Sequence, residues 1–441
     1  MLKKLPFSGK VLYASSSAGW AMIDRLVITW LMYYYITSPE VGEPLLMPVV
    51  FGTIMLLGRV VDAVADPLVA LWSDNFSGRL GRRIPFMLVG GVLYFLVFAA
   101  LFYPPVAGES LYNALYLILM VGLYFLLFTV YVCPYLALLP ELARTSRDRV
   151  DLATLRAVFT LLGVAIALVG SGVLIALLGF RGMIWSLGLL GLLFMYLPAF
   201  IKEKDYAQSL PATLGLTQAV MTTFKNQAFR IYLVGNAAFW FGFNIITLAL
   251  PFYVTILLGL QEEQTSIFFA VTFGMAVLTF PIVNILAKNM GPKKVMIISM
   301  FLFVAVLPMF YFLGGSCLGL TPYNFGLLLM GFAGIPLASL FVLPDAIVAS
   351  ITDVEESLSG QRREAMYFGA QGFVLKIVMG LSSFVTGILL QFFGETAADP
   401  LGIQLTGPVA AVFILLGGIV FMRYPEKEVL SFEQIIPPVK R

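Results

Sequence analysis

Long apolar stretches separated by short polar segments fill the chain from end to end. Each stretch has roughly the 20 residues that a helix needs to cross a bilayer. The predicted spans are 11–36, 46–72, 84–104, 111–139, 152–179, 182–201, 228–258, 264–287, 294–314, 322–350, 364–393 and 405–424. The pattern therefore predicts an all-α membrane protein with twelve transmembrane helices.

A polar segment at the middle of the chain divides these spans into two equal sets. Residues 202–227 carry several charges and are predicted to form a cytoplasmic linker. Residues 1–201 then form an N-terminal six-helix bundle. Residues 228–441 form a C-terminal six-helix bundle with a short cytoplasmic tail.

Short motifs recur at equivalent places in the two halves. GRLGRRIPF at 78–86 and AKNMGPKKV at 287–295 each place a glycine before a basic pair. PYLALLPELA at 134–143 corresponds in the same way to PLASLFVLPDA at 336–346. Weak internal repeats of this kind are typical of transporters built from two pseudo-symmetric bundles.

The basic residues orient the predicted spans. Of the 27 lysines and arginines, 22 fall in the proposed inner segments, and the proposed outer loops hold Arg181 alone. Cytoplasmic loops of membrane proteins are enriched in lysine and arginine. We therefore expect both termini in the cytoplasm and the protein in the cell (inner) membrane.

Composition excludes several classes of function. The chain is 60% hydrophobic and 12% charged, against about a quarter charged in soluble domains. It has no histidine, and its two cysteines, Cys133 and Cys317, form no CxxC pattern. Neither HExxH nor GxSxG is present, and there is no GxxxxGK[ST] loop for ATP. We expect a non-enzyme, without cofactor or nucleic-acid partner, that is a monomer in contact with membrane lipid.

The stretch VVDAVADPL at 60–68 places charges inside the second span. Asp62 and Asp66 are four residues apart and share a helix face with Arg59. Two carboxylates at this spacing repel each other unless a cation lies between them or one is protonated. We interpret the pair as a site that binds and releases a cation or proton. The alternative is a structural salt bridge.

Other charges inside spans have two interpretations each. Lys376 lies in the middle of the eleventh span and either pairs with Asp62 or Asp66 or extends to the membrane interface. Asp24, on one face with Trp20, either binds a polar substrate group or pairs with an arginine. Arg156 is either a substrate or gating residue or an anchor at the inner surface.

Two polar or aromatic stripes offer further substrate contacts. Tyr131 belongs to an aromatic stripe in the fourth span, where ordinary helix packing is the alternative. Asn236, Trp240 and Asn244 share one face of the seventh span. Amides facing lipid are costly, so this second face is expected to bind a sugar-like ligand, with ordinary helix packing as the alternative here too.

These residues carry a resemblance to a known family. GRVVDAVADPLVALWSDNFSGRLGRRIPF at 58–86, LMYYY at 31–35, RDRVDLATLRAVF at 147–159 and FGAQGFVLK at 368–376 resemble motifs of the glycoside–pentoside–hexuronide:cation symporters of the major facilitator superfamily. The resemblance implies a major facilitator fold and symport of a sugar, glycoside or related small polar solute by alternating access. It implies cation binding at Asp62 and Asp66, with Arg59 and Lys376 in the charge network and Arg156 near the site.

The chain departs from the family's sugar site at several positions. Val132 and Leu136 stand where melibiose-type members have an acid and a tryptophan, and the span-one aspartate aligns nearer Ala21 than Asp24. Ala65 replaces an asparagine, which favours H+ over Na+ as the coupling ion, although Thr129 could supply a ligand oxygen for Na+. Lysophospholipid symporters of the family also lack the span-four acid, so a lysophospholipid or another amphiphile is the alternative substrate. In those symporters the span-eleven lysine meets a phosphate headgroup, so the resemblance implies that Lys376 is a substrate-binding candidate as well.

Overall fold

The computed structural model describes residues 5–37, 40, 42–76, 78, 80–143, 146–201, 203–206, 223–315, 319–359 and 364–426. The chain divides into two compact units. The first unit comprises Met1–Ala212 with Leu250–Thr255 and Leu260–Ile267. The second comprises Thr213–Ala249, Ile256–Gly259 and Phe268–Arg441. Most of the predicted linker and the position of Cys317 lie outside the described residues, and the predicted domain bounds stay a prediction.

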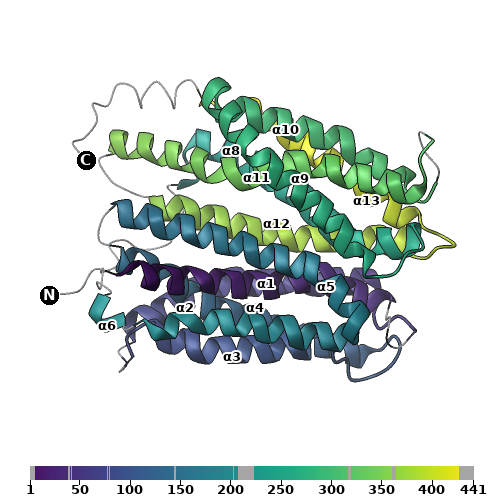
Figure 1. Ribbon diagram of the computed structural model, residues 1–441, viewed down its shortest axis with the longest axis horizontal. Helices are drawn as coiled ribbons and strands as arrows, with labels where there is room; N and C mark the ends of the chain where they lie inside the picture. The colour runs from purple at the N-terminus through teal and green to yellow at the C-terminus, as the bar shows by residue number, and fades with distance from the viewer. Residues whose placement is uncertain are drawn as a thin grey trace. The chain divides into compact units, whose positions relative to one another are not determined.

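The first unit is a bundle of long helices (Figure 1). Its helices are α1 (Phe7–Thr37), α2 (Pro48–Asn75), α3 (Ile84–Ala100), α4 (Leu111–Leu142), α5 (Ser146–Tyr196) and the short α6 (Glu203–Tyr206), with a 3-10 turn at Leu197–Phe200. Two helix starts are marked by proline in the first turn, at Pro48 and Pro85, where a missing amide hydrogen costs nothing. The helix α1 packs closely along α5, and α2 packs along α4.

The second unit repeats this helical architecture. It contains most of α8 (Gln227–Phe252) and of α9 (Gln264–Met290), and all of α10 (Pro292–Val306), α11 (Pro322–Ser359), α12 (Glu364–Phe393) and α13 (Leu401–Phe421). A π-helical turn at Tyr253–Leu257 continues α8, and a 3-10 turn at Leu307–Phe312 continues α10. The all-α fold class predicted from the sequence is confirmed.

The predicted spans map onto these helices with one merger. The spans at 152–179 and 182–201 both fall in α5, which is broken at Gly179, where φ is 72°. Residues with a side chain rarely adopt this backbone angle, so a glycine occupies the break between the two helices that are merged in α5. Within the described residues, nine helices are long and apolar enough to cross a membrane, and Ile84–Ala100 is a shorter apolar helix.

The glycine–basic motif has the same structural role in both units. Gly81 precedes α3 with φ 121°, and Gly291 precedes α10 with φ 88°. In each unit, a glutamate that follows the last long helix caps the N-terminus of the helix that begins after this glycine. The Glu203 carboxylate accepts the amides of Arg82, Arg83 and Ile84, and Glu426 accepts the amide of Lys293.

These caps explain why the motif needs glycine. A Cβ built on Gly81 would overlap the Glu203 carboxylate, and one on Gly291 would lie 2.8 Å from that of Glu426. A carboxylate at a helix N-terminus also satisfies orphan amides and interacts favourably with the helix dipole. The internal repeat predicted from the sequence is therefore a repeated structural device.

We expect Gly81→Ala to lower the free energy of unfolding by about 1–3 kcal/mol, because it adds strain at a positive φ and displaces Glu203. The matched control is Gly122→Ala in α4, where a Cβ meets no atom within 4 Å. Thermal unfolding of the two purified variants measures the difference. Equal midpoints for Gly81→Ala and the wild type would contradict the assigned role of the glycine.

Candidate functional site

The candidate site lies inside the first unit, where α1, α2 and α4 meet. We call it the charge cluster, and it consists of Asp24, Arg25, Arg59, Asp62, Asp66 and Thr129. Its carboxylates on α2 come close to α4 because Gly58 has no side chain: a Cβ there would lie 2.7 Å from the Phe125 ring. The three- and four-residue spacing of Arg59, Asp62 and Asp66 puts them on one face of α2, and the close packing of α2 on α4 brings that face to Thr129.

A single hydroxyl joins the two carboxylates of α2. Thr129 on α4 has its Oγ1 2.8 Å from Asp62 Oδ1 and 3.3 Å from Asp66 Oδ1. Asp62 is 0% exposed, whereas Asp66 is half-buried. Three oxygen atoms from two helices, those of Thr129, Asp62 and Asp66, therefore lie close together. Asp66 is the carboxylate of this group that is partly exposed.

Arg59 is the buried cation of the cluster. Its two amino groups point to different carboxylates: one lies 3.3 Å from Asp62 Oδ2 and the other 3.4 Å from Asp24 Oδ1. The guanidinium also lies over the Phe125 ring, 4.3 Å from the ring centroid, in a cation–π contact. The sequence predicted the Arg59–Asp62 pairing from helix spacing, and the structure adds Asp24 as a second partner.

Asp24 is engaged by arginines on both sides. Besides Arg59, the adjacent Arg25 lies 3.7 Å from Asp24 Oδ2. Asp24 and Arg25 are both buried, at 7% and 8% exposed. Of the two interpretations of Asp24, these contacts favour the ion pair with arginine over a direct substrate contact.

The aromatic residues of this unit pack the helices together. Tyr131 is fully buried, its hydroxyl donates to the Met195 carbonyl at 2.5 Å, and it lies 2.7 Å from Ser16 Oγ. Trp20 packs edge-on against Phe128. Both were predicted to bind substrate, and in this structure Tyr131 has the packing role that was its alternative.

Arg156 lies near one end of α5 and is half-buried. Its backbone carbonyl accepts the Ser17 and Thr160 hydroxyls, which ties α5 to α1. The Tyr13 and Tyr135 rings stack with their centroids 4.6 Å apart, and the positive charge of Arg156 interacts electrostatically with both tyrosines. This placement leaves both interpretations of Arg156 open.

The second unit holds the predicted amides on α8, along a face that is joined to α12. Tyr232 donates to Gln371 at 2.8 Å, and Asn244 donates to Ser382 at 2.5 Å. The bonded positions differ by 139 and 138 residues, so the helices run in parallel register. Asn236 lies one turn after Tyr232, and the same register places it level with Leu375, the neighbour of Lys376 in the sequence.

Asn236 stands out on this face because its amide is both buried and unsatisfied. The residue is 0% exposed, and neither Nδ2 nor Oδ1 has a hydrogen-bond partner among the residues that the structure describes. The Asn244 Oδ1 is unsatisfied as well. Trp240, half-buried between them, packs edge-on against Phe243 and Phe341. A buried amide without partners is costly, which points to a polar group that is not part of the chain.

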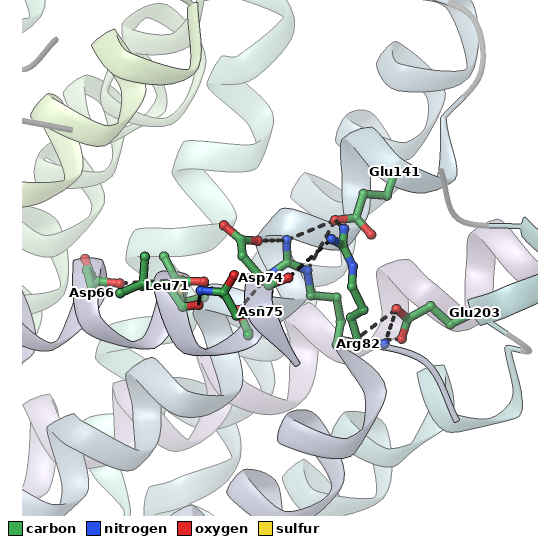
Figure 2. Close-up of polar contacts among 11 residues, drawn as sticks. Asp66, Leu71, Asp74, Asn75, Arg82, Glu141 and Glu203 are labelled. Carbon is green, nitrogen blue, oxygen red and sulfur yellow. Dashed lines mark hydrogen bonds and ion pairs between the residues drawn. The ribbon is translucent and has the colours of Figure 1, made fainter. Parts of the chain in front are cut away.

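The basic pair of the GRLGRRIPF motif forms an ion-pair cluster around the α2–α3 loop with acidic residues that the sequence did not single out (Figure 2). Arg82 lies 2.9 Å from Glu141 on α4, and Arg83 lies 3.0 Å from the same carboxylate and also pairs with Asp74. Burial lowers the pKa of Arg83, but Glu141 and Asp74 more than offset it, so the net pKa is raised and the guanidinium stays charged. The basic pair in GRLGRRIPF was the signal for this cluster, but its acidic partners are distant in sequence.

A second ion pair ties the start of α1 to the start of α5. Lys10 donates hydrogen bonds of 2.8 Å to both Asp148 and Asp151. These bonds raise the pKa of the Lys10 ammonium above its ordinary value. The helices of the first unit are therefore joined by ion pairs at the α2–α3 loop and at the starts of α1 and α5, and by the charge cluster inside the unit.

The comparisons with known proteins agree with this architecture. A family model described as "MFS/sugar transport protein" matches residues 12–427. The chain is 21% identical to the uncharacterized symporter sll1374 of Synechocystis sp., covering 96% of this chain and 95% of that one. It is 22% identical to the isoprimeverose transporter of Lactiplantibacillus pentosus, covering 89% and 82%.

Solved structures show the same fold. A bacterial homologue of the human lysosomal transporter Spinster superposes with a TM-score of 0.69 at 13% identity, covering 98% of this chain and 99% of that one. The chain belongs to the MFS/sugar transport protein family and is an integral multi-pass membrane protein. The resemblance to glycoside–pentoside–hexuronide symporters is confirmed, and the protein is a transporter rather than an enzyme.

We expect Thr129→Val to destabilise the protein by about 1–3 kcal/mol, because it removes the hydroxyl from buried Asp62 while keeping the side chain's shape. Thr53→Val on α2 is the control, since the Thr53 hydroxyl bonds the Val49 carbonyl of its own helix. Thermal unfolding midpoints report both changes. A Thr129→Val variant as stable as Thr53→Val would mean that the hydroxyl does not hold the carboxylates.

Proposed function

We propose that the protein is a cation-coupled symporter that carries a sugar, glycoside or related small polar solute by alternating access. The observation that carries this proposal is the convergence of Asp62, Asp66 and Thr129 on α2 and α4. Two carboxylates on one hydroxyl provide oxygen ligands for a monovalent cation, or one carboxylate can take a proton. The family membership supports symport as the mode of transport.

Arg59 compensates part of the charge at this site. It neutralises Asp62 on the side opposite to Thr129, so Asp62 presents one oxygen to the cation and the other to the arginine. We propose a proton as the coupling ion, because Ala65 offers no side-chain oxygen, with Na⁺ as the alternative. Lys376 belongs to α12 of the second unit, and its role in the charge network stays a prediction.

Coupling requires that the cation changes the affinity for the solute. If binding of one ligand stabilises the conformation that binds the other, each raises the other's affinity by the same factor. A gradient of the cation then drives accumulation of the solute. We further propose a cell (inner) membrane location with both termini in the cytoplasm, supported by the distribution of the basic residues.

The unsatisfied amide of Asn236 supports a hydroxylated solute. A sugar hydroxyl both donates and accepts, and so matches an amide that lacks partners for its nitrogen and its oxygen. Trp240 adds an apolar ring on the same helix face. The name of one relative, an isoprimeverose transporter, supports the same solute class.

We expect Asp62→Asn and Asp66→Asn each to abolish concentrative uptake while leaving expression and folding intact, because an amide does not take up a proton and attracts Na⁺ weakly. The exposed Glu109→Gln is the control carboxylate. Uptake of labelled sugars and glycosides into cells or proteoliposomes measures the effect. If both aspartate variants accumulate solute as the wild type does, the cation-site assignment is wrong.

We expect Asn236→Leu to raise the half-saturation concentration for solute by about tenfold or more, since losing a hydrogen-bonding group from a polar site costs that much. The unfolding midpoint should stay the same or rise, because a buried unsatisfied amide is removed. Asn284→Leu, at an exposed position of α9, is the matched control. Unchanged solute affinity in Asn236→Leu would remove Asn236 from the solute site.

A further inference from the structure

The Arg59 guanidinium contacts two carboxylates that lie on different helices. A guanidinium that faced one carboxylate alone could give it two parallel hydrogen bonds. Here one amino group lies 3.3 Å from Asp62 on α2 and the other lies 3.4 Å from Asp24 on α1. The Asp62 oxygen that faces the arginine is Oδ2, and Oδ1 accepts a hydrogen bond from Thr129.

We propose that Asp24 is a positioning residue that sets the affinity of the Asp62–Asp66 site for the coupling cation, by holding one arm of Arg59 away from Asp62. This inference rests on the proposed function, because it assumes that Asp62 and Asp66 bind that cation. It assigns Asp24 to the cation site rather than to the solute site. Asp24 acts through Arg59 and needs no contact with either ligand.

Two effects of Asp24 on the cation have the same sign. Its negative charge adds to the attraction for a cation in a buried region, where charges interact strongly. It also competes with Asp62 for Arg59. Without the Asp24 charge, Arg59 would pair with Asp62 alone and would take the place of the cation more effectively.

Arg25 opposes Asp24 in this arrangement. It lies 3.7 Å from Asp24 Oδ2, on the carboxylate oxygen that Arg59 does not use. Its second amino group, Nη1, is buried and has no hydrogen-bond partner among the residues that the structure describes. Arg25 thus weakens the hold of Asp24 on Arg59, so its removal should strengthen cation binding.

Two tyrosine hydroxyls from neighbouring helices also lie near Arg59 and Asp24. Tyr94 on α3 and Tyr124 on α4 interact with these charges, and their hydroxyls lie 2.9 Å apart. They form a hydrogen-bonded pair and contribute no formal charge at neutral pH. Arg25 and Arg59 are the two cations that the structure places against the Asp24 carboxylate.

The test needs no knowledge of the solute. The purified full-length chain is placed in lipid nanodiscs, and its thermal unfolding midpoint is followed as NaCl replaces choline chloride at constant ionic strength. A second series varies pH without Na⁺. A cation that binds the folded state raises the midpoint with its concentration, which gives an apparent affinity. Asp66→Asn identifies the part of the response that comes from the site.

The expected results differ in direction between the two variants. Asp24→Asn weakens the affinity for the responsive ion by about tenfold or more, and Asp24→Glu, which keeps the charge, restores most of it. Arg25→Gln strengthens the affinity. A folding defect alone would lower the midpoints of these variants without moving their ion dependence in opposite directions.

Three outcomes would overturn the inference in distinguishable ways. If Asp66→Asn abolishes the response while Asp24→Asn leaves the affinity unchanged, Asp24 does not position Arg59 and the proposed function stands. If Arg25→Gln weakens the affinity as Asp24→Asn does, the competition between the arginines is wrong. If Asp66→Asn responds as the wild type does, or the wild type responds to neither ion, the proposed cation site fails, and this inference fails with it.

Discussion

The constraint on which the first unit depends is the cost of a carboxylate held away from water. Asp62 is fully buried, and an isolated charge in such a place would be strongly unfavourable. The fold meets this cost with a cation on one side and a hydroxyl on the other, from Arg59 and Thr129. The close approach at Gly58 brings Phe125 within reach of that arginine. The side chains that neutralise the site thus also fix the α2–α4 packing.

The same problem is solved differently at the helix ends. There, the polar groups that need partners are backbone amides at the starts of α3 and α10. Glu203 and Glu426 supply those partners, and Gly81 and Gly291 leave room for the carboxylates. Because the device occurs once in each unit, each bundle is fastened within itself. Alternating access needs bundles of this kind, which keep their internal packing while they move.

Much of this architecture could be predicted from the sequence, because it depends on short-range patterns. The lengths of the apolar stretches predicted the helices, and helix periodicity predicted that Arg59, Asp62 and Asp66 share one face. The Asp24–Arg59 pair and the Glu203 cap could not be predicted, since each joins segments 35 or more residues apart whose register depends on the packing of whole helices. A sequence also does not show which hydrogen-bond partners a buried amide lacks, so the unsatisfied amide of Asn236 within the described part of the chain could not be predicted. The sequence predicted two spans where α5 is one merged element, and Gly179 marks the break inside it.

The most direct test of the account is whether solute and cation cross the membrane together. The protein would be reconstituted in liposomes containing a pH-sensitive dye, and sugars, glycosides and lysolipids would be added in turn, with parallel uptake under an imposed Na⁺ gradient. The account predicts that a sugar or glycoside evokes an inward proton flux, or accumulates on the Na⁺ gradient. Solute that only equilibrates, with no ion flux and no response to either gradient, would contradict cation-coupled symport. A signal from lysolipid alone would contradict the proposed solute class.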